Sequence, residues 1–276
     1  MVAKTTTVPN LMMDSAGIAT TRPGLSADDW EFGVLRAIRM LTVITPCDSS
    51  RVVLRELSST GRTVTIVPVA APGANGFPRA VASPNSPQAA TPSGQPFLGC
   101  SPASPATLNQ PIPALGTGTG TGSAVTVRFA GEDAIAGTSS VLAVSSDEVL
   151  LHELVHAFRQ TRGQSHCERI TSGLPSIDTA PANSNNVQFY DTLEEFVAIV
   201  ISNIYRAENN KPGLRRDHHG AAPLNFPLTT AKSFSQAWQT QMQRMLDDMQ
   251  ILCFDLGRLN ISYNPIREFL MAKRIL

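Results

Sequence analysis

Two histidines and a glutamate lie close together in the sequence LHELVHAFR at residues 151–159. They are His152, Glu153 and His156, in the pattern HExxH. On an α-helix, side chains four positions apart lie on the same face, so both imidazoles can bind one metal ion. Zinc suits such a pair, because its catalytic sites use three protein ligands and keep a fourth position open for water. The pattern therefore predicts a zinc site on a helix.

Glu153 follows the first of these histidines and can reach a water molecule in that open position. A bound zinc ion lowers the pKa of the water to roughly 7, and a nearby carboxylate can take its proton. The resulting hydroxide can attack a carbonyl carbon, which is the chemistry of peptide-bond hydrolysis. We assign Glu153 as the general base. Chance explains the motif poorly, so the stronger alternative is a degenerate site that has kept the motif and lost the metal.

A third ligand is expected from the second apolar helix predicted by the sequence, over residues 191–208. This helix carries two adjacent carboxylates, Glu194 and Glu195, in its first turn. Two-histidine-one-glutamate zinc sites take their glutamate from a helix downstream of the motif. Asp191 and Glu194 match a capping box, which leaves Glu195 for the metal. The alternative is that both carboxylates merely favour the positive end of the helix.

The motif itself needs a helix over residues 145–162. Ser145 and Glu148 match a capping box, and Gly163 provides a C-terminal stop. Both histidines then lie in the middle of the helix. Just before it, residues 124–130 alternate apolar and polar side chains and predict a half-buried strand. That strand is either an edge strand that binds a substrate backbone or an ordinary strand of the sheet.

Two further groups of polar residues follow the motif. His166 is expected to be an exposed loop residue rather than a ligand, because Arg159 stands where the longer HExxHxxGxxH pattern needs glycine. The segment GLRRDHHG at residues 213–220 can fold back over the cleft. Arg215 or His218 can then stabilise the oxyanion of a tetrahedral intermediate. The alternative for this segment is a solvated charged loop.

The remaining patterns predict helices over residues 28–42, 49–57 and 233–259, a strand over residues 62–69 and a short C-terminal helix. Ser26 can cap the first helix. Residues 70–122 are rich in Pro, Gly, Ser and Thr and predict a long, partly disordered surface loop. Its GTGTGTGS run lacks the lysine and the helix of a phosphate-binding loop.

The expected fold is α+β and zincin-like. A small, mostly antiparallel sheet packs on the HExxH helix and on a second, Glu-bearing helix, and the C-terminal part is mostly helical. Residues 26–276 form a single domain of metallopeptidase type, and residues 1–25 form a flexible tail. At 276 residues the chain is long enough to bury a substantial core. We expect it to act as a monomer.

Composition excludes several classes of function. Lys+Arg 22 balances Asp+Glu 22, which argues against a nucleic-acid partner. The sequence contains no apolar run long enough for a transmembrane helix, and its N-terminus lacks the apolar core of a Sec signal peptide. The four cysteines form no CxxC pair and are expected to be free buried thiols, with a single Cys100–Cys167 bridge as the alternative. They are Cys47, Cys100, Cys167 and Cys253.

Three segments in order, HELVHAFR, EEFVAIVISNIYRAE and GLRRDH, resemble the NleD-type effector metallopeptidases. These are zinc proteases that bacterial pathogens deliver into host cells. Asn203 and Arg206 match the helix pattern of that group, and Arg215 matches its Arg. His218 stands where the group usually has Tyr, which puts the identity of the oxyanion-stabilising residue in doubt.

The sequence EFVA, which begins at Glu195, is also similar to the ligand motif EFFA of lethal-factor-type proteases, and this supports Glu195. The resemblance covers roughly residues 64–216 without the low-complexity insert. It implies a zinc endopeptidase that is secreted, or delivered into a target cell by a specialised bacterial secretion system, and that cleaves proteins there. The alternatives are a non-catalytic module that binds a host protein and a zinc hydrolase of a non-peptide substrate.

Overall fold

The computed structural model describes residues 3–44, 46–69, 80–98, 114–131, 144–166, 192–216, 223–224 and 227–276. Four residues named above lie outside these ranges, namely Cys100, Cys167, Asp191 and His218. Statements about them therefore remain predictions.

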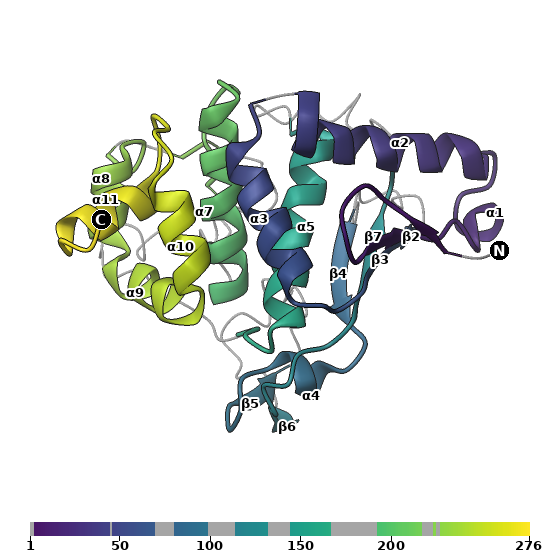
Figure 1. Cartoon of the computed structure of the whole chain (residues 1–276), viewed down its shortest axis with the longest axis horizontal. Coiled ribbons are helices and arrows are strands. Elements are labelled where there is room, and N and C mark those ends of the chain that lie inside the picture. Colours follow the sequence, from purple (N-terminus) through teal and green to yellow (C-terminus); the bar gives the residue numbers. More distant parts are fainter. Residues whose placement is uncertain are drawn as a thin grey trace, which may run out of the picture.

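The chain forms successive layers around helix α5 (Ser146–Thr161), which carries the HExxH motif (Figure 1). A β-sheet packs on one side of α5, while α3 (Asp48–Ser59) and α7 (Leu193–Glu208) pack against other faces. The C-terminal helices lie beyond α7 and are α8 (Ala231–Ala237), α9 (Gln239–Asp248), α10 (Gln250–Gly257) and α11 (Pro265–Ala272). Because α5 lies between these layers, nearly all of its side chains are buried, polar ones included.

The sheet is mixed, with strand order β1-β2-β3-β7-β4. Its strands are β1 (Lys4–Thr5), β2 (Leu11–Met13), β3 (Val64–Pro68), β7 (Val125–Phe129) and β4 (Ala80–Pro84). The central pairs β2–β3 and β3–β7 are parallel, and the outer pairs are antiparallel. The expectation of a mostly antiparallel sheet is therefore wrong. Helices separate β2 from β3 along the chain, and such crossover connections produce parallel pairs. The coarser expectation of a mixed helix-and-sheet protein is confirmed.

Residues 3–25 pack into this domain and are not the flexible tail that we expected. Strand β2 pairs with β3, and it buries Leu11 and Met13, while Ile18 of α1 (Ile18–Thr21) is also buried. Lys4 of β1 donates a 2.6 Å hydrogen bond to Glu31 and thereby lowers the pKa of that carboxyl. The segment is therefore held by strand pairing with β3 and by burial of its apolar side chains.

Strand β7 is an interior strand, because β3 and β4 flank it on both sides. Of the two readings of residues 124–130, the structure therefore supports the ordinary sheet strand, and β4 ends the described sheet on this side. The expectation of a loop throughout residues 70–122 is also wrong, because strand β4 lies within this stretch. That stretch also contains α4 (Pro87–Ala90) and the antiparallel pair β5 (Pro96–Leu98) and β6 (Ala114–Thr117).

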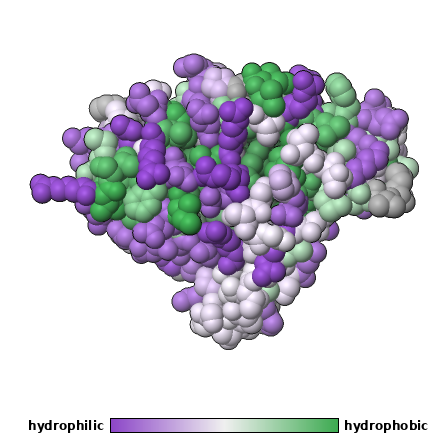
Figure 2. Space-filling view, in the orientation of Figure 1, coloured by the Kyte–Doolittle hydropathy of each residue, from purple (hydrophilic) through white to green (hydrophobic). Residues whose placement is uncertain are grey.

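The GTGTGTG run packs its main chain against neighbouring main chain. Around β5 and β6 the surface projects from the molecule and is neither strongly hydrophilic nor hydrophobic (Figure 2). A Cβ atom on Gly118 would overlap the carbonyl oxygens of Pro92 and Thr91, and one on Gly122 would overlap that of Thr161 at the end of α5. The glycines of this run therefore permit close packing onto α5, instead of cradling a phosphate.

Replacement of Gly122 by alanine is expected to lower the free energy of unfolding by more than the about 1–3 kcal/mol that the left-handed backbone alone costs. Gly122 has a φ of +77°, which strains alanine, and the added methyl group also meets Thr161. Gly94→Ala is the matched control, because Gly94 has a φ of +76° with nothing within 4 Å of the new Cβ. Chemical denaturation measures the free energy of unfolding of both variants. The difference between their losses is the cost of the contact between the added methyl group and Thr161, and equal losses would contradict that contact.

Two predicted helices have a different extent in the structure. Helix α2 (Ala27–Arg39) begins at the predicted cap, where Ser26 accepts a hydrogen bond from the Asp29 N–H, and it continues as a π-helix over Met40–Ile44. The helix predicted over residues 233–259 is divided at Trp238 and Met249, where the backbone leaves helical geometry. Both side chains are buried in the core, so tertiary packing overrides the helical pattern there.

Among the described residues, no helix is both long and apolar enough to cross a membrane. Cys47 and Cys253 are buried free thiols, as expected. Burial raises the pKa of the Cys253 thiol to about 12, so this thiol is unreactive at neutral pH.

Candidate metal centre

Helices α5 and α7 lie side by side (Figure 1), and polar contacts join them at three levels. Glu148 near the start of α5 contacts Arg206 near the end of α7. One level along, the two histidines of the motif meet Glu195, and beyond them Arg159 contacts Glu194. Since the start of one helix meets the end of the other, the helices are antiparallel. The histidines therefore lie between two buried ion pairs.

His152, His156 and Glu195 form a buried cluster whose ligand atoms lie within 4.8 Å of one another. The two Nε2 atoms are 3.2 Å apart, and each is 3.2–3.5 Å from a carboxylate oxygen of Glu195. Tetrahedral zinc with bonds of about 2.0–2.1 Å needs ligand atoms about 3.3–3.4 Å apart. The spacing and the donor types therefore fit a tetrahedral metal ion. This group could hold a metal ion.

Glu195 reaches the cluster because Thr192 caps helix α7. The Thr192 hydroxyl accepts a 3.3 Å hydrogen bond from the Glu195 N–H and so fixes the first turn. The predicted cap, Asp191, lies one residue earlier, outside the described residues. The structure thus brings the expected glutamate to the histidines, but the cap lies at a different residue from the one that we predicted.

Glu194 lies behind the cluster and contacts the other nitrogen of a histidine. One of its oxygens is 3.8 Å from Nδ1 of His156, and the other accepts a 2.8 Å hydrogen bond from Arg159. The His166 N–H donates to the same oxygen, at 2.6 Å. Carboxylates in this position orient a metal-binding histidine and raise its basicity. Glu194 is therefore held by Arg159 and by the main chain of His166, outside the group of three ligand atoms, which separates it from Glu195.

His166 is not a member of the cluster, which agrees with the prediction that it is no ligand. The prediction that it is exposed is wrong, because its side chain is only 11% exposed. Its Nε2 lies 3.6 Å from a carboxylate oxygen of Asp248, which also accepts a hydrogen bond from Arg159. Helix α9, which comes much later in the sequence, thus supplies a carboxylate that lies close to the His166 side chain.

The pKa values of the two histidines in the cluster are shifted in opposite directions. Burial lowers the pKa of His152 to about 3, although Glu195 opposes this. Burial also lowers the pKa of His156, but the negative charge of Glu195 and the hydrogen bonds that Glu194 and Glu195 accept outweigh it and raise the pKa well above its usual value. The pKa of Glu195 is raised by burial but held well below its usual range, chiefly by the charge of His156. A metal ion would compete with the proton of His156, because metal ligands must be deprotonated.

Glu153 lies next to the cluster and is almost fully buried. Burial raises the pKa of its carboxyl to about 7, with the charge of His156 acting in the opposite direction. A carboxyl with a pKa near neutrality can accept a proton as a general base and later donate it as a general acid. Its Oε2 accepts a 2.7 Å hydrogen bond from the Ala82 N–H of β4.

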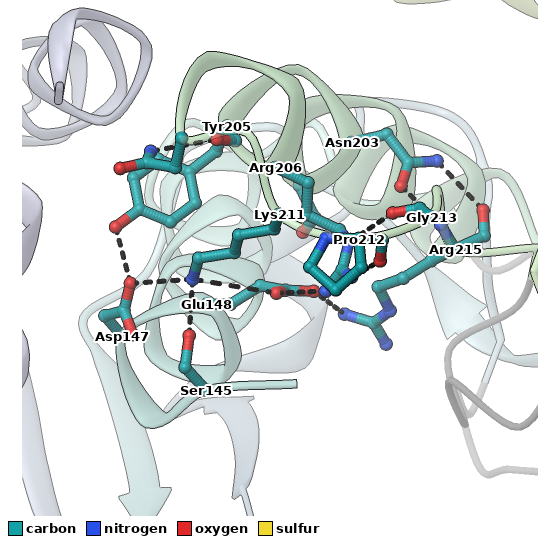
Figure 3. Close-up of polar contacts among 12 residues, drawn as sticks. Ser145, Asp147, Glu148, Asn203, Tyr205, Arg206, Lys211, Pro212, Gly213 and Arg215 are labelled. Carbon is teal, nitrogen blue, oxygen red and sulfur yellow. Dashed lines mark hydrogen bonds and ion pairs between the residues drawn. The ribbon is translucent and has the colours of Figure 1, made fainter. Parts of the chain in front are cut away.

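At the start of α5, Glu148 has a different role from the capping box that we predicted. Ser145 is the N-cap residue, but it makes no side-chain capping bond. Glu148 instead accepts a 2.6 Å hydrogen bond from Arg206, with Lys211 at 3.9 Å and Arg215 at 3.6 Å (Figure 3). The capping-box prediction is therefore wrong, because Glu148 is the carboxylate that three cations share.

The segment that follows α7 is held against this network, as expected for a segment that folds back (Figure 3). Asn203 accepts from the Arg215 N–H at 2.6 Å and donates to the Arg215 carbonyl at 2.9 Å. Arg215 is buried, and its charge acts to lower the pKa of both His152 and Glu153, although burial affects each of them more. Arg215 therefore lies near the cluster. His218 lies outside the described residues.

The contacts that four charged residues make around the cluster were not predicted from the sequence. These residues are Glu148, Arg159, Glu194 and Arg206. A signal for them exists in the helical spacing. Glu148 lies four positions before His152, and Arg159 lies three positions after His156, so all lie near one face of α5. Charged residues on the same face as the motif, in helices otherwise apolar, mark the contact between α5 and α7.

Comparison of the chain with models of known families, with characterised proteins and with solved structures found no match. The site therefore has to be interpreted from its own geometry.

Proposed function

We propose that this protein is a zinc-dependent endopeptidase. One observation carries the proposal: HExxH histidines and a downstream glutamate converge in a buried cluster with tetrahedral spacing, beside a carboxyl whose pKa burial raises to about 7. Structural zinc sites close all four positions with protein ligands, whereas three ligands leave one position open for chemistry. The described residues supply three ligands to this cluster, and this number, together with the adjacent base, supports hydrolysis.

Each residue has a separate task in the proposed reaction. His152, His156 and Glu195 would hold zinc, which when bound supplies a Lewis acid that polarises a carbonyl group and acidifies water. Glu153 would accept a proton from the attacking water on its carboxylate and then pass that proton to the leaving amine. The positive charge of Arg215, which acts to lower the pKa of His152 and Glu153, would stabilise negative charge that develops on the carbonyl oxygen. His218 is the alternative for this last role.

The resemblance to delivered effector proteases extends the proposal to the biological setting. The protein would be secreted, or injected into a target cell, and would cleave proteins there as a monomer. The support for this part is the resemblance of HELVHAFR, EEFVAIVISNIYRAE and GLRRDH alone.

Metal analysis and cleavage mapping together test the proposal. Protein purified without chelators is expected to contain about one zinc ion per chain. Incubation of a target-cell lysate with the zinc-loaded protein, followed by mapping of new protein termini, is expected to show cleavages that are absent with Glu153→Ala. Substoichiometric zinc would favour a binding module with a degenerate site. Full zinc without new termini would favour hydrolysis of another kind of substrate.

A further inference from the structure

The Glu153 side chain is bound by the main chain of the last strand of the sheet. Its Oε2 accepts a 2.7 Å hydrogen bond from the Ala82 N–H, in the middle of β4. Gln160, two turns further along α5, donates a 3.3 Å hydrogen bond to the Ala82 carbonyl. The N–H and C=O of Ala82 therefore both point away from β7, toward α5. Neither group is used in the pairing of β4 with β7.

We infer that the Ala82 peptide group is a positioning element for Glu153 in the proposed hydrolysis, so this inference rests on the proposed function. A carboxylate on a helix can adopt several rotamers, and only some of them direct an oxygen toward the metal cluster. A donor on one oxygen fixes the carboxylate plane and leaves the other oxygen for the proton transfer. Supporting hydrogen bonds of this kind hold catalytic groups in their productive geometry.

Two hydrogen bonds fix the position of strand β4 relative to helix α5 and to Glu153. Contacts from Glu153 and Gln160 to one peptide group fix the register between the strand and α5. Movement of β4 by one residue would place a different peptide group at Glu153, since successive N–H groups of a strand point to opposite sides. The position of β4 is thereby coupled to the orientation of the base.

Ala82→Pro removes the donor without breaking a hydrogen bond between β4 and β7, and its ring Cδ takes the place of the N–H and displaces Glu153 Oε2 from the strand. Pro84 already occupies a position of the same orientation in β4, and proline is tolerated in edge strands where the N–H faces outward. With zinc-loaded protein and a peptide taken from a mapped cleavage site, kcat is expected to fall about ten- to hundredfold with KM unchanged. Ala80→Pro, at the first residue of β4, is the matched control and should retain the kcat of the wild type.

An exchange measurement tests the contact without any substrate. In the zinc-loaded protein, the Ala82 amide proton is expected to exchange with solvent at least about tenfold more slowly than in Glu153→Ala, because hydrogen-bonded amides are protected. Equal exchange rates in the two proteins, or an unchanged kcat in Ala82→Pro, would overturn the inference. A wild type that binds zinc and cleaves nothing would refute the proposed function, whereas the exchange rates report on the contact independently.

Discussion

Replacement of His156 by alanine is expected to weaken zinc binding by at least about a hundredfold. Loss of an outer partner of a metal ligand already costs about 10- to 100-fold in affinity, and His156 is itself placed to be a ligand. Its Nε2 lies 3.2 Å from that of His152 and 3.5 Å from Glu195. Competition with a chromophoric zinc chelator at fixed pH measures the change.

His166→Ala is the matched control for this measurement. Its imidazole lies near the same network, 3.6 Å from Asp248, but outside the cluster. Its N–H bond to Glu194 is made by the main chain and survives the substitution. Zinc affinity should therefore stay within about tenfold of the wild type. If His156→Ala retained zinc as tightly as His166→Ala, the assignment of the ligands would be wrong.

The sequence predicted those parts of the site that depend on a single helix. HExxH places His152 and His156 on one face of α5 because the helical repeat alone determines which residues share a face. Glu195 could be assigned because few carboxylates occur in apolar helices without a partner. The capping argument that singled it out relied on Asp191, whereas the structure uses Thr192. The glutamate that lies beside the two histidines was therefore predicted, although the residue that caps its helix was not.

The contacts that depend on tertiary structure could not be predicted in this way. Ala82 touches Glu153 through its main chain, and a main-chain donor leaves no mark in the pattern of residue types. Likewise, Glu148 and Arg206 are 58 positions apart, and their pairing follows only from the antiparallel contact of α5 and α7. The parallel strand pairs also depend on how the chain crosses over, which alternation of polar and apolar residues does not encode.

Glu148→Gln is expected to lower the free energy of unfolding by about 3–5 kcal/mol, the usual cost of removing one partner of a buried ion pair. The Glu148 and Arg206 side chains are both 0% exposed. Without the carboxylate charge, the buried Arg206 and Arg215 lose this partner, whereas Lys211 keeps Asp147 at 3.1 Å. Denaturant titration of the variant measures the loss.

The control is an ion pair of the same chemistry at the surface. Asp255→Asn removes the carboxylate that Arg55 contacts, and the Arg55 side chain is 58% exposed. Exposed pairs contribute about 0.2–1 kcal/mol, so this variant should unfold close to the wild type. Comparable losses in both variants would show that burial of Glu148 does not determine its contribution.

A double-mutant cycle separates the charge pair from the packing around it. Arg206→Met also removes hydrogen bonds to the carbonyls of Pro212 and Gly213, so its cost includes more than the pair. Combined with Glu148→Gln, it removes both buried charges, and no uncompensated carboxylate remains. The double variant should therefore lose less stability than the sum of the single losses. An additive result would mean that Glu148 and Arg206 stabilise α5 and α7 independently. The contact between the two helices next to His152 would then not act as an ion pair.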